Sequence, residues 1–170
     1  MRNYANMKII PILIIFCAVV FHSCDKGLAP EAESLGISNG IQGTILFENW
    51  PSPDSLYDLR LVAFRNFPPE NIFVELLSEQ AYAYPSITDT THIPFFVDRY
   101  EFELELPPGE YGYLVVAQQY GSNLLLDWRA VGQYDVDADS LPSPLNVDEN
   151  AVTRNLVIGV DFDHLPIQPF

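Results

Sequence analysis

The chain has 170 residues, two cysteines and a formal net charge of −15, from 8 basic and 23 acidic side chains. Such a surface repels the phosphate backbone of nucleic acids, so the composition argues against nucleic acid as a partner. It predicts a solvated acidic surface that favours solubility, cations and basic partners.

The N-terminal segment is laid out like a secretory signal peptide. Arg2 and Lys8 flank the start of an apolar run from Ile9 to Phe21, and Ser23 and Cys24 follow it. The run is shorter than the roughly 20 apolar residues needed to span a bilayer, so it suits a secretory signal better than a membrane span. A plain secretory signal with a coincidental cysteine and a short uncleaved anchor remain as alternatives.

The pair Ser23-Cys24 at the end of this run resembles the lipobox of bacterial lipoproteins. In that family a small residue precedes the cysteine, which carries acyl chains and becomes the new N-terminus. The resemblance implies a signal peptide over residues 1–23, a lipidated Cys24 (the family's palmitate-type acylation) and a location in the cell envelope. We expect the outer membrane rather than the inner membrane as the site of anchoring.

Removal of the signal peptide would also remove Cys17, which leaves Cys24 as the lipid site. No thiol then remains for a disulfide, a thiolate metal site or a cysteine nucleophile. Residues 24–39 are small and polar without sustained periodicity, and we interpret them as a flexible tether. Residues 40–170 are long enough for a single domain.

Alternation of apolar and polar residues predicts the strands of this domain. In the first expected strand Ile41, Ile45 and Phe47 share one face, and a proline-rich loop containing Trp50 follows. The second expected strand covers residues 59–65. The segment Glu70–Ala83 permits a short helix or a strand, and that choice stays open; Tyr84 to Pro94 is expected to be a long loop.

The clearest strand covers residues 100–106, where Tyr100, Phe102 and Leu104 line one face and three glutamates line the other. Pro107-Pro108-Gly109-Glu110 reads as a tight turn. Residues 111–117 are almost wholly apolar, so we predict a hairpin between the two segments.

Two further strands are expected at residues 128–134 and 155–162, separated by an acidic loop from Asp135 to Asp148. About six or seven short strands with turn-rich links predict an all-β fold, and specifically a single antiparallel β-sandwich after the N-terminal signal helix.

The hairpin sequence from Phe102 to Tyr111, together with the opening Gly40-Ile41-Gln42-Gly43-Thr44-Ile45, resembles carboxypeptidase-regulatory-like domains. These are prealbumin-like (transthyretin-like), broadly immunoglobulin-like β-sandwiches. The resemblance implies that fold and a non-catalytic module, because family members mostly serve as accessory domains.

Two sets of residues are candidate ligand sites. Asp135, Asp137 and Asp139 alternate like the first carboxylates of a calcium loop, and carboxylate oxygens suit Ca²⁺. The expected Gly and Glu of an EF-hand are replaced by Ser140 and Asn146, so a looser Ca²⁺ site is the prediction. Trp50 and Trp128 could stack on sugar rings, although tryptophan more often packs in a core.

No catalytic motif is recognisable, and we predict that the protein is not an enzyme. The expected function is that of a lipid-anchored extracytoplasmic lipoprotein with a binding or structural role toward an envelope protein or glycan. The alternatives are a carbohydrate- or Ca²⁺-binding accessory lipoprotein and a small envelope hydrolase that uses two carboxylates.

Overall fold

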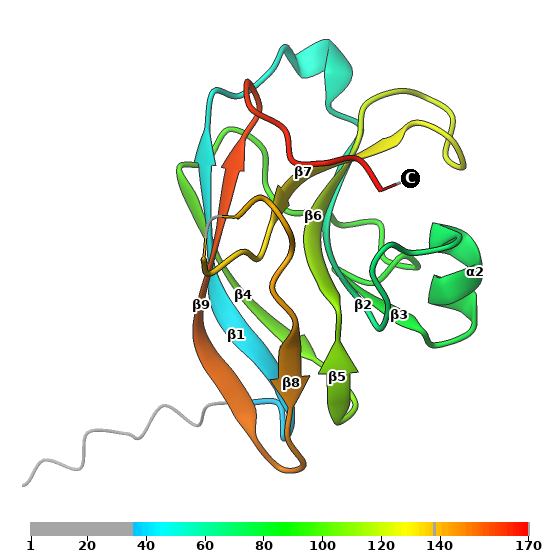
Figure 1. The fold of residues 1–170 in the computed structure, drawn as a ribbon. Coiled ribbons are helices and arrows are strands. Elements are labelled where there is room, and N and C mark those ends of the chain that lie inside the picture. The colour runs from blue at the N-terminus through cyan, green and yellow to red at the C-terminus, as the bar shows by residue number, and fades with distance from the viewer. Residues whose placement is uncertain (1–35, 138, 170) are drawn as a thin grey trace, which may run out of the picture. The chain divides into compact units, whose positions relative to one another are not determined.

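The computed structural model describes residues 36–137 and 139–169. The predicted signal peptide, Cys24 and most of the predicted tether lie outside the described residues. In chain order the elements are β1 (Gly40–Glu48), the 3₁₀ turn η1 (Pro53–Ser55), β2 (Asp58–Phe64), α2 (Ile72–Leu77), β3 (Ala81–Tyr84), β4 (Arg99–Glu105), β5 (Gly109–Tyr111), β6 (Tyr113–Gln119), β7 (Trp128–Gln133), β8 (Leu145–Val147) and β9 (Val152–Asp161) (Figure 1).

Seven of these strands form one sheet in the order β3-β2-β6-β7-β9-β1-β4. The all-β prediction is therefore confirmed for the described part of the chain. The sheet is mixed, however, because β1 pairs antiparallel with β4 but parallel with β9, where antiparallel pairing was expected throughout. Two parallel neighbouring strands need a long crossover connection, and here the chain from the end of β1 to the start of β9 forms that connection.

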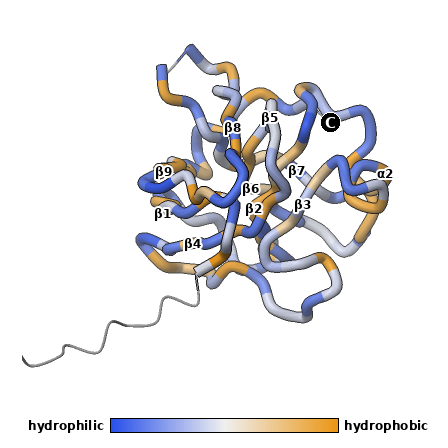
Figure 2. Tube along the Cα trace, turned by 90° about the horizontal axis from the view of Figure 1, so that it is seen from below, coloured by the Kyte–Doolittle hydropathy of each residue, from blue (hydrophilic) through white to orange (hydrophobic). Residues whose placement is uncertain are grey.

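The sheet curls so that β9-β1-β4 lies opposite β3-β2-β6 (Figure 1). Side chains from both parts form one core. The predicted inward faces of β1, β4 and β9 are confirmed, since Ile41, Ile45, Phe102, Leu104 and Ile158 are all buried. Figure 2 shows hydrophobic and hydrophilic segments alternating along the trace, as expected for strands with one buried face.

A second apolar cluster lies on the outer face of β2 and β6, beneath α2. Asn71 caps this helix, because its side chain accepts a hydrogen bond of 3.0 Å from the Val74 N–H. The open segment Glu70–Ala83 thus contains both alternatives, a one-and-a-half-turn helix and then the start of β3. None of the helices among the described residues is long and apolar enough to cross a membrane.

The predicted hairpin between residues 100–106 and 111–117 is wrong. β4 pairs with β1, whereas β6 pairs with β2 and β7. Pro107 and Pro108 lack an N–H, so they cannot continue the β4 ladder, and the chain crosses from one part of the sheet to the other. Gly109, at a φ of 133°, begins the short strand β5, which pairs instead with β8. β8 itself lies inside the segment from Asp135 to Asp148, which the sequence predicts to be entirely loop.

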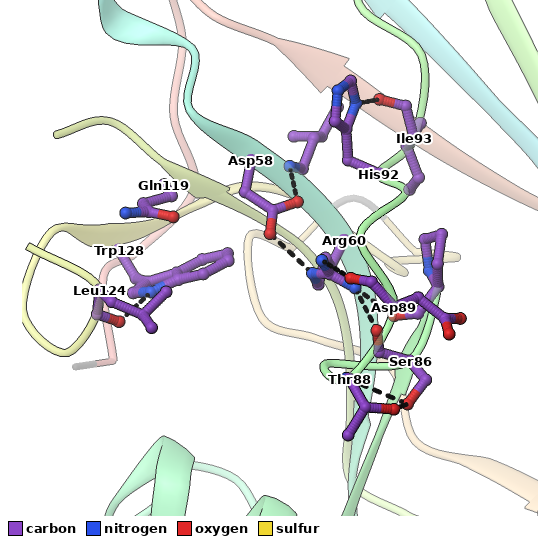
Figure 3. A network of polar contacts seen from close by, with 12 residues as sticks. Asp58, Arg60, Ser86, Thr88, Asp89, His92, Ile93, Gln119, Leu124 and Trp128 are labelled. Carbon is purple, nitrogen blue, oxygen red and sulfur yellow. Dashed lines mark hydrogen bonds and ion pairs between the residues drawn. The ribbon is translucent and has the colours of Figure 1, made fainter. Parts of the chain in front are cut away.

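Arg60 on β2 organises the long loop between β3 and β4 (Figure 3). Its side chain is 8% exposed and forms an ion pair of 2.8 Å with Asp58. The guanidinium also donates to the backbone carbonyls of Pro85 and Asp89, at 2.9 and 3.1 Å, and to that of Ser86. These bonds satisfy the loop carbonyls and hold the loop against the sheet.

Candidate functional site

A groove in the described part of the chain has a volume of about 620 Å³. It lies over the C-terminal ends of β1, β7 and β9. Its sides are formed by the loop near Ser140 and by the C-terminal tail. Three groups of residues line it: backbone around Gly132 and Gly159, carboxylates of Glu48, Asp135 and Asp161, and apolar side chains of Leu46, Leu165 and Ile167. A groove with acidic and apolar walls suits a ligand that carries both a positive and an apolar part.

Two glycines form the joint between β7 and β9. The two strands pair only through Gly132 with Val160 and Gln133 with Gly159. A Cβ at position 132 would lie 2.4 Å from the Gly159 carbonyl oxygen, so the backbones can approach this closely only because position 132 is glycine. A Cβ at position 159 would meet nothing within 4 Å, since it would project into open space at the groove.

The C-terminal tail is attached to β7 through Gln168. The Gln168 amide accepts a hydrogen bond of 2.9 Å from the Ala130 N–H and donates one of 3.0 Å to the Ala130 carbonyl. The Gln168 side chain thereby satisfies the backbone groups of Ala130, at a position where β7 has no pairing with β9. This attachment keeps Leu165 and Ile167 in place as one wall of the groove.

Asp161, at the end of β9, gathers three hydrogen bonds beside this wall. It accepts from the Asn49 amide at 2.8 Å and from the Asp163 N–H at 2.9 Å, and its second oxygen lies 2.8 Å from His164 Nδ1. These bonds, that from Asn49 first, lower the pKa of Asp161 to about 2. The hydrogen bond to Asp161 raises the pKa of His164 above its ordinary 6.5.

We expect the protonation of His164 to depend on Asp161. In the folded protein the pKa of His164 is raised, so the ion pair stabilises the fold below pH 6.5 and is lost as pH rises through the folded value. The Asp161 pKa is lowered, so its contribution is present above pH 4 and is lost as pH falls toward 2. An NMR titration should show Asp161→Asn lowering the His164 midpoint; an unchanged midpoint would contradict the pairing.

The three aspartates predicted as a Ca²⁺ loop do lie together. Asp135, Asp137 and Asp139 can each offer one oxygen, and these oxygens all lie within 4.8 Å of one another. Asp135 also lines the groove and accepts hydrogen bonds from the N–H groups of Asp137 and Ser140. Backbone bonds of this kind shape an acidic loop without a metal, so Ca²⁺ binding stays a prediction.

The predicted sugar-stacking residues lie apart from the groove. Trp50 packs among aromatic rings, with centroids 4.8 Å from Phe47 and from Phe162, and its indole N–H donates to the Val97 carbonyl. Trp128 joins the cluster beneath α2, and its indole N–H donates to the Leu124 carbonyl (Figure 3). In both places the indole ring packs against other side chains and its N–H has a hydrogen-bond acceptor, so packing alone explains the tryptophan. Stacking on a glycan stays a prediction.

No protein-family model, curated protein or solved structure matches this chain. The candidate site therefore depends on geometry alone. The sequence did not reveal the contributions of Asn49, Asp161 and His164, because they come from the ends of two strands distant in sequence. The three-residue spacing between Asp161 and His164 is the single local signal that could have indicated part of the site.

Proposed function

We propose that this chain is a lipid-anchored extracytoplasmic protein of the bacterial envelope with a non-catalytic binding role. The observation that carries the proposal is the N-terminal pattern, an apolar run that ends at Ser23 and Cys24. Two or three acyl chains on Cys24 would anchor the protein stably, because each buried CH₂ contributes about 0.8 kcal/mol. The all-β domain would then act at the membrane surface.

The groove over β1, β7 and β9 supports a binding role for that domain. Its volume of about 620 Å³ falls within the range of small-ligand sites. The fold proposal is a β-sandwich, in which the β3-β2-β6-β7 part faces the β9-β1-β4 part. This arrangement agrees with the resemblance to carboxypeptidase-regulatory-like modules, in which binding rather than catalysis is the common role.

The test of the anchor is the intact mass of the full chain, extracted from membranes of a Gram-negative host. We expect a mass that begins at Cys24 and includes acyl chains, in the outer-membrane fraction. Cys24→Ala should abolish acylation, whereas Cys17→Ala, inside the apolar run, should leave it unchanged. An unlipidated chain that starts at another residue would overturn the proposal.

A second candidate function is Ca²⁺ binding, favoured by the three converging aspartate oxygens. We expect Ca²⁺ to give saturable heat in isothermal titration. The double substitution Asp137→Asn and Asp139→Asn should abolish that heat, because it removes two anionic ligands. Asp54→Asn, on the exposed turn η1, is the matched control and should leave it unchanged. No heat with the unsubstituted protein would remove this candidate.

A further inference from the structure

The strands at the two ends of the sheet, β3 and β4, each lack a neighbour on one side among the described residues. On β4 the register identifies the free groups. The Leu106 N–H donates to Asn39 and the Phe47 N–H donates to Asp98, so even-numbered residues of β4 point their backbone groups toward β1. The N–H and C=O groups of Glu101 and Glu103 therefore point outward, away from the sheet.

The same residues place acidic side chains beside these free backbone groups. Glu101, Glu103 and Glu105 alternate along the outer face of β4. Thr44 donates to Glu101 at 2.8 Å, Arg99 also pairs with Glu101, and the Ile37 N–H donates to Glu103 at 3.1 Å. These contacts leave the edge negative, since three carboxylates lie there with Arg99, while the Arg154 guanidinium donates to Gln42, the β1 residue paired with Glu103.

A second groove lies between the two free edges. It has a volume of about 220 Å³ and is lined by Ala81, Tyr82 and Ala83 from β3 and by Leu104 and Glu105 from β4. On the β3 side, the Arg65 N–H donates to the Gln80 carbonyl, so even-numbered residues of β3 point their backbone groups toward β2. The backbone groups of Ala81 and Ala83 therefore point away from β2. At the other end of this gap the Tyr84 and Tyr100 hydroxyls lie 3.2 Å apart and bridge the edges.

We propose that the free edge of β4 binds an extended segment of a basic partner protein, in which basic and apolar residues alternate. Such a segment would pair with the outward backbone groups and extend the sheet by one strand. Because side chains alternate between faces, its basic residues would face Glu101, Glu103 and Glu105. Its apolar residues would point to the other face, beside Leu104 and the groove.

Charge selects this occupant over the two nearest alternatives. A second copy would bring its own three glutamates against these three, and like charges directly opposed destabilise a strand pair. Residues 25–35 of the chain, directly before Gly36, are also acidic, since Asp25, Glu31 and Glu33 outnumber Lys26 there. A basic segment from another protein is the occupant that the edge attracts, and the attraction does not depend on lipidation of Cys24.

The test uses the full chain, purified in a neutral detergent, and a fluorescent peptide of alternating lysine and valine, seven residues long. We expect saturable binding by fluorescence anisotropy that weakens with added salt. A peptide with glutamate in place of lysine, and one with its lysines and valines in two separate blocks, should not bind. Absence of saturable binding by the alternating lysine peptide would overturn the proposal.

Variants locate the binding surface. Glu101→Gln with Glu105→Gln should weaken peptide binding by about tenfold, because two exposed ion pairs with the peptide are lost. Glu103→Pro should block docking, because it removes an outward N–H without removing a bond to β1. Asp54→Asn with Glu149→Gln removes two exposed carboxylates elsewhere on the surface and should leave binding unchanged. Unchanged binding in both β4 variants, or an equal loss in this control, would overturn the assignment to β4.

The glutamates could instead serve only to keep copies apart, as charged edge residues often do. In that case the Glu101→Gln and Glu105→Gln chain would self-associate in analytical ultracentrifugation, and the unsubstituted chain would not bind the lysine peptide. That combination would also overturn the proposal. Lipidation is measured separately by intact mass, so failure here and failure of the envelope proposal are distinguishable.

Discussion

Arg60→Met should lower the free energy of unfolding by about 3 kcal/mol, the cost typical of removing one partner of a buried ion pair. Asp58, whose side chain is only 15% exposed, would lose its cation. The carbonyls of Pro85, Ser86 and Asp89 would also lose their donor. Methionine is long enough to fill much of the vacated space, so the effect would report the lost polar contacts more than a cavity.

Urea unfolding followed by tryptophan fluorescence measures this effect, and hydrogen exchange should show faster opening of residues 85–93. Arg99→Met is the matched control, because Arg99 pairs with Glu101 on the surface with a side chain that is 66% exposed. Its substitution should change the unfolding free energy by no more than about 0.5 kcal/mol. Adding Asp58→Asn to Arg60→Met should recover part of the loss, because the unpaired buried charge is then removed. Equal urea midpoints for Arg60→Met and Arg99→Met would contradict this account of Arg60.

Gly132→Ala should destabilise the fold by about 2 kcal/mol, as expected when an added methyl group meets a packed backbone. The new Cβ would lie 2.4 Å from the Gly159 carbonyl oxygen and 2.6 Å from a Val160 methyl group, so β7 and β9 would have to separate. Those strands pair through only two residue pairs, which makes this joint the narrowest connection in the seven-stranded sheet. The separation would also distort the floor of the large groove.

Gly159→Ala provides the control on the facing strand. Its Cβ would meet nothing within 4 Å, so its effect on the unfolding free energy should stay within about 0.5 kcal/mol. Thermal and urea unfolding of the two variants, measured side by side, test the difference. If both alanines were equally tolerated, close contact between β7 and β9 would not be required for stability.

The groove and the free edge of β4 use different properties of the same acidic surface. In the groove, Glu48 and Asp161 lie beside apolar side chains from β1 and the tail, which suits a compact ligand. Along β4, the carboxylates flank unpaired backbone groups, which suits an extended chain. The two surfaces are separable by substitution, because Glu101, Glu103 and Glu105 do not line the groove.

The sequence alone determined which residues of the outer strands face inward. Alternation located the buried faces of β1, β4 and β9, because burial on one face requires apolar residues at every second position. β2 and β6 are buried on both faces, so alternation did not assign their residues to one core or the other. The sequence also indicated that Asp135, Asp137 and Asp139 lie close together, since neighbours in a short loop cannot be far apart. The choice between helix and strand after Glu70 stayed open, because both fitted a segment so short.

Only the tertiary structure decided which strand pairs with which. Every residue except proline offers the same backbone N–H and C=O groups, so the alternation of a strand does not indicate which other strand it pairs with. The segments joined by Pro107 and Pro108 therefore read as a hairpin, while in the structure β4 pairs with β1 and the parallel partner of β1 is the final strand, β9. The groove and the free edge of β4 follow from that pairing, because it brings Asn49 to Asp161 and leaves Glu101, Glu103 and Glu105 at the end of the sheet.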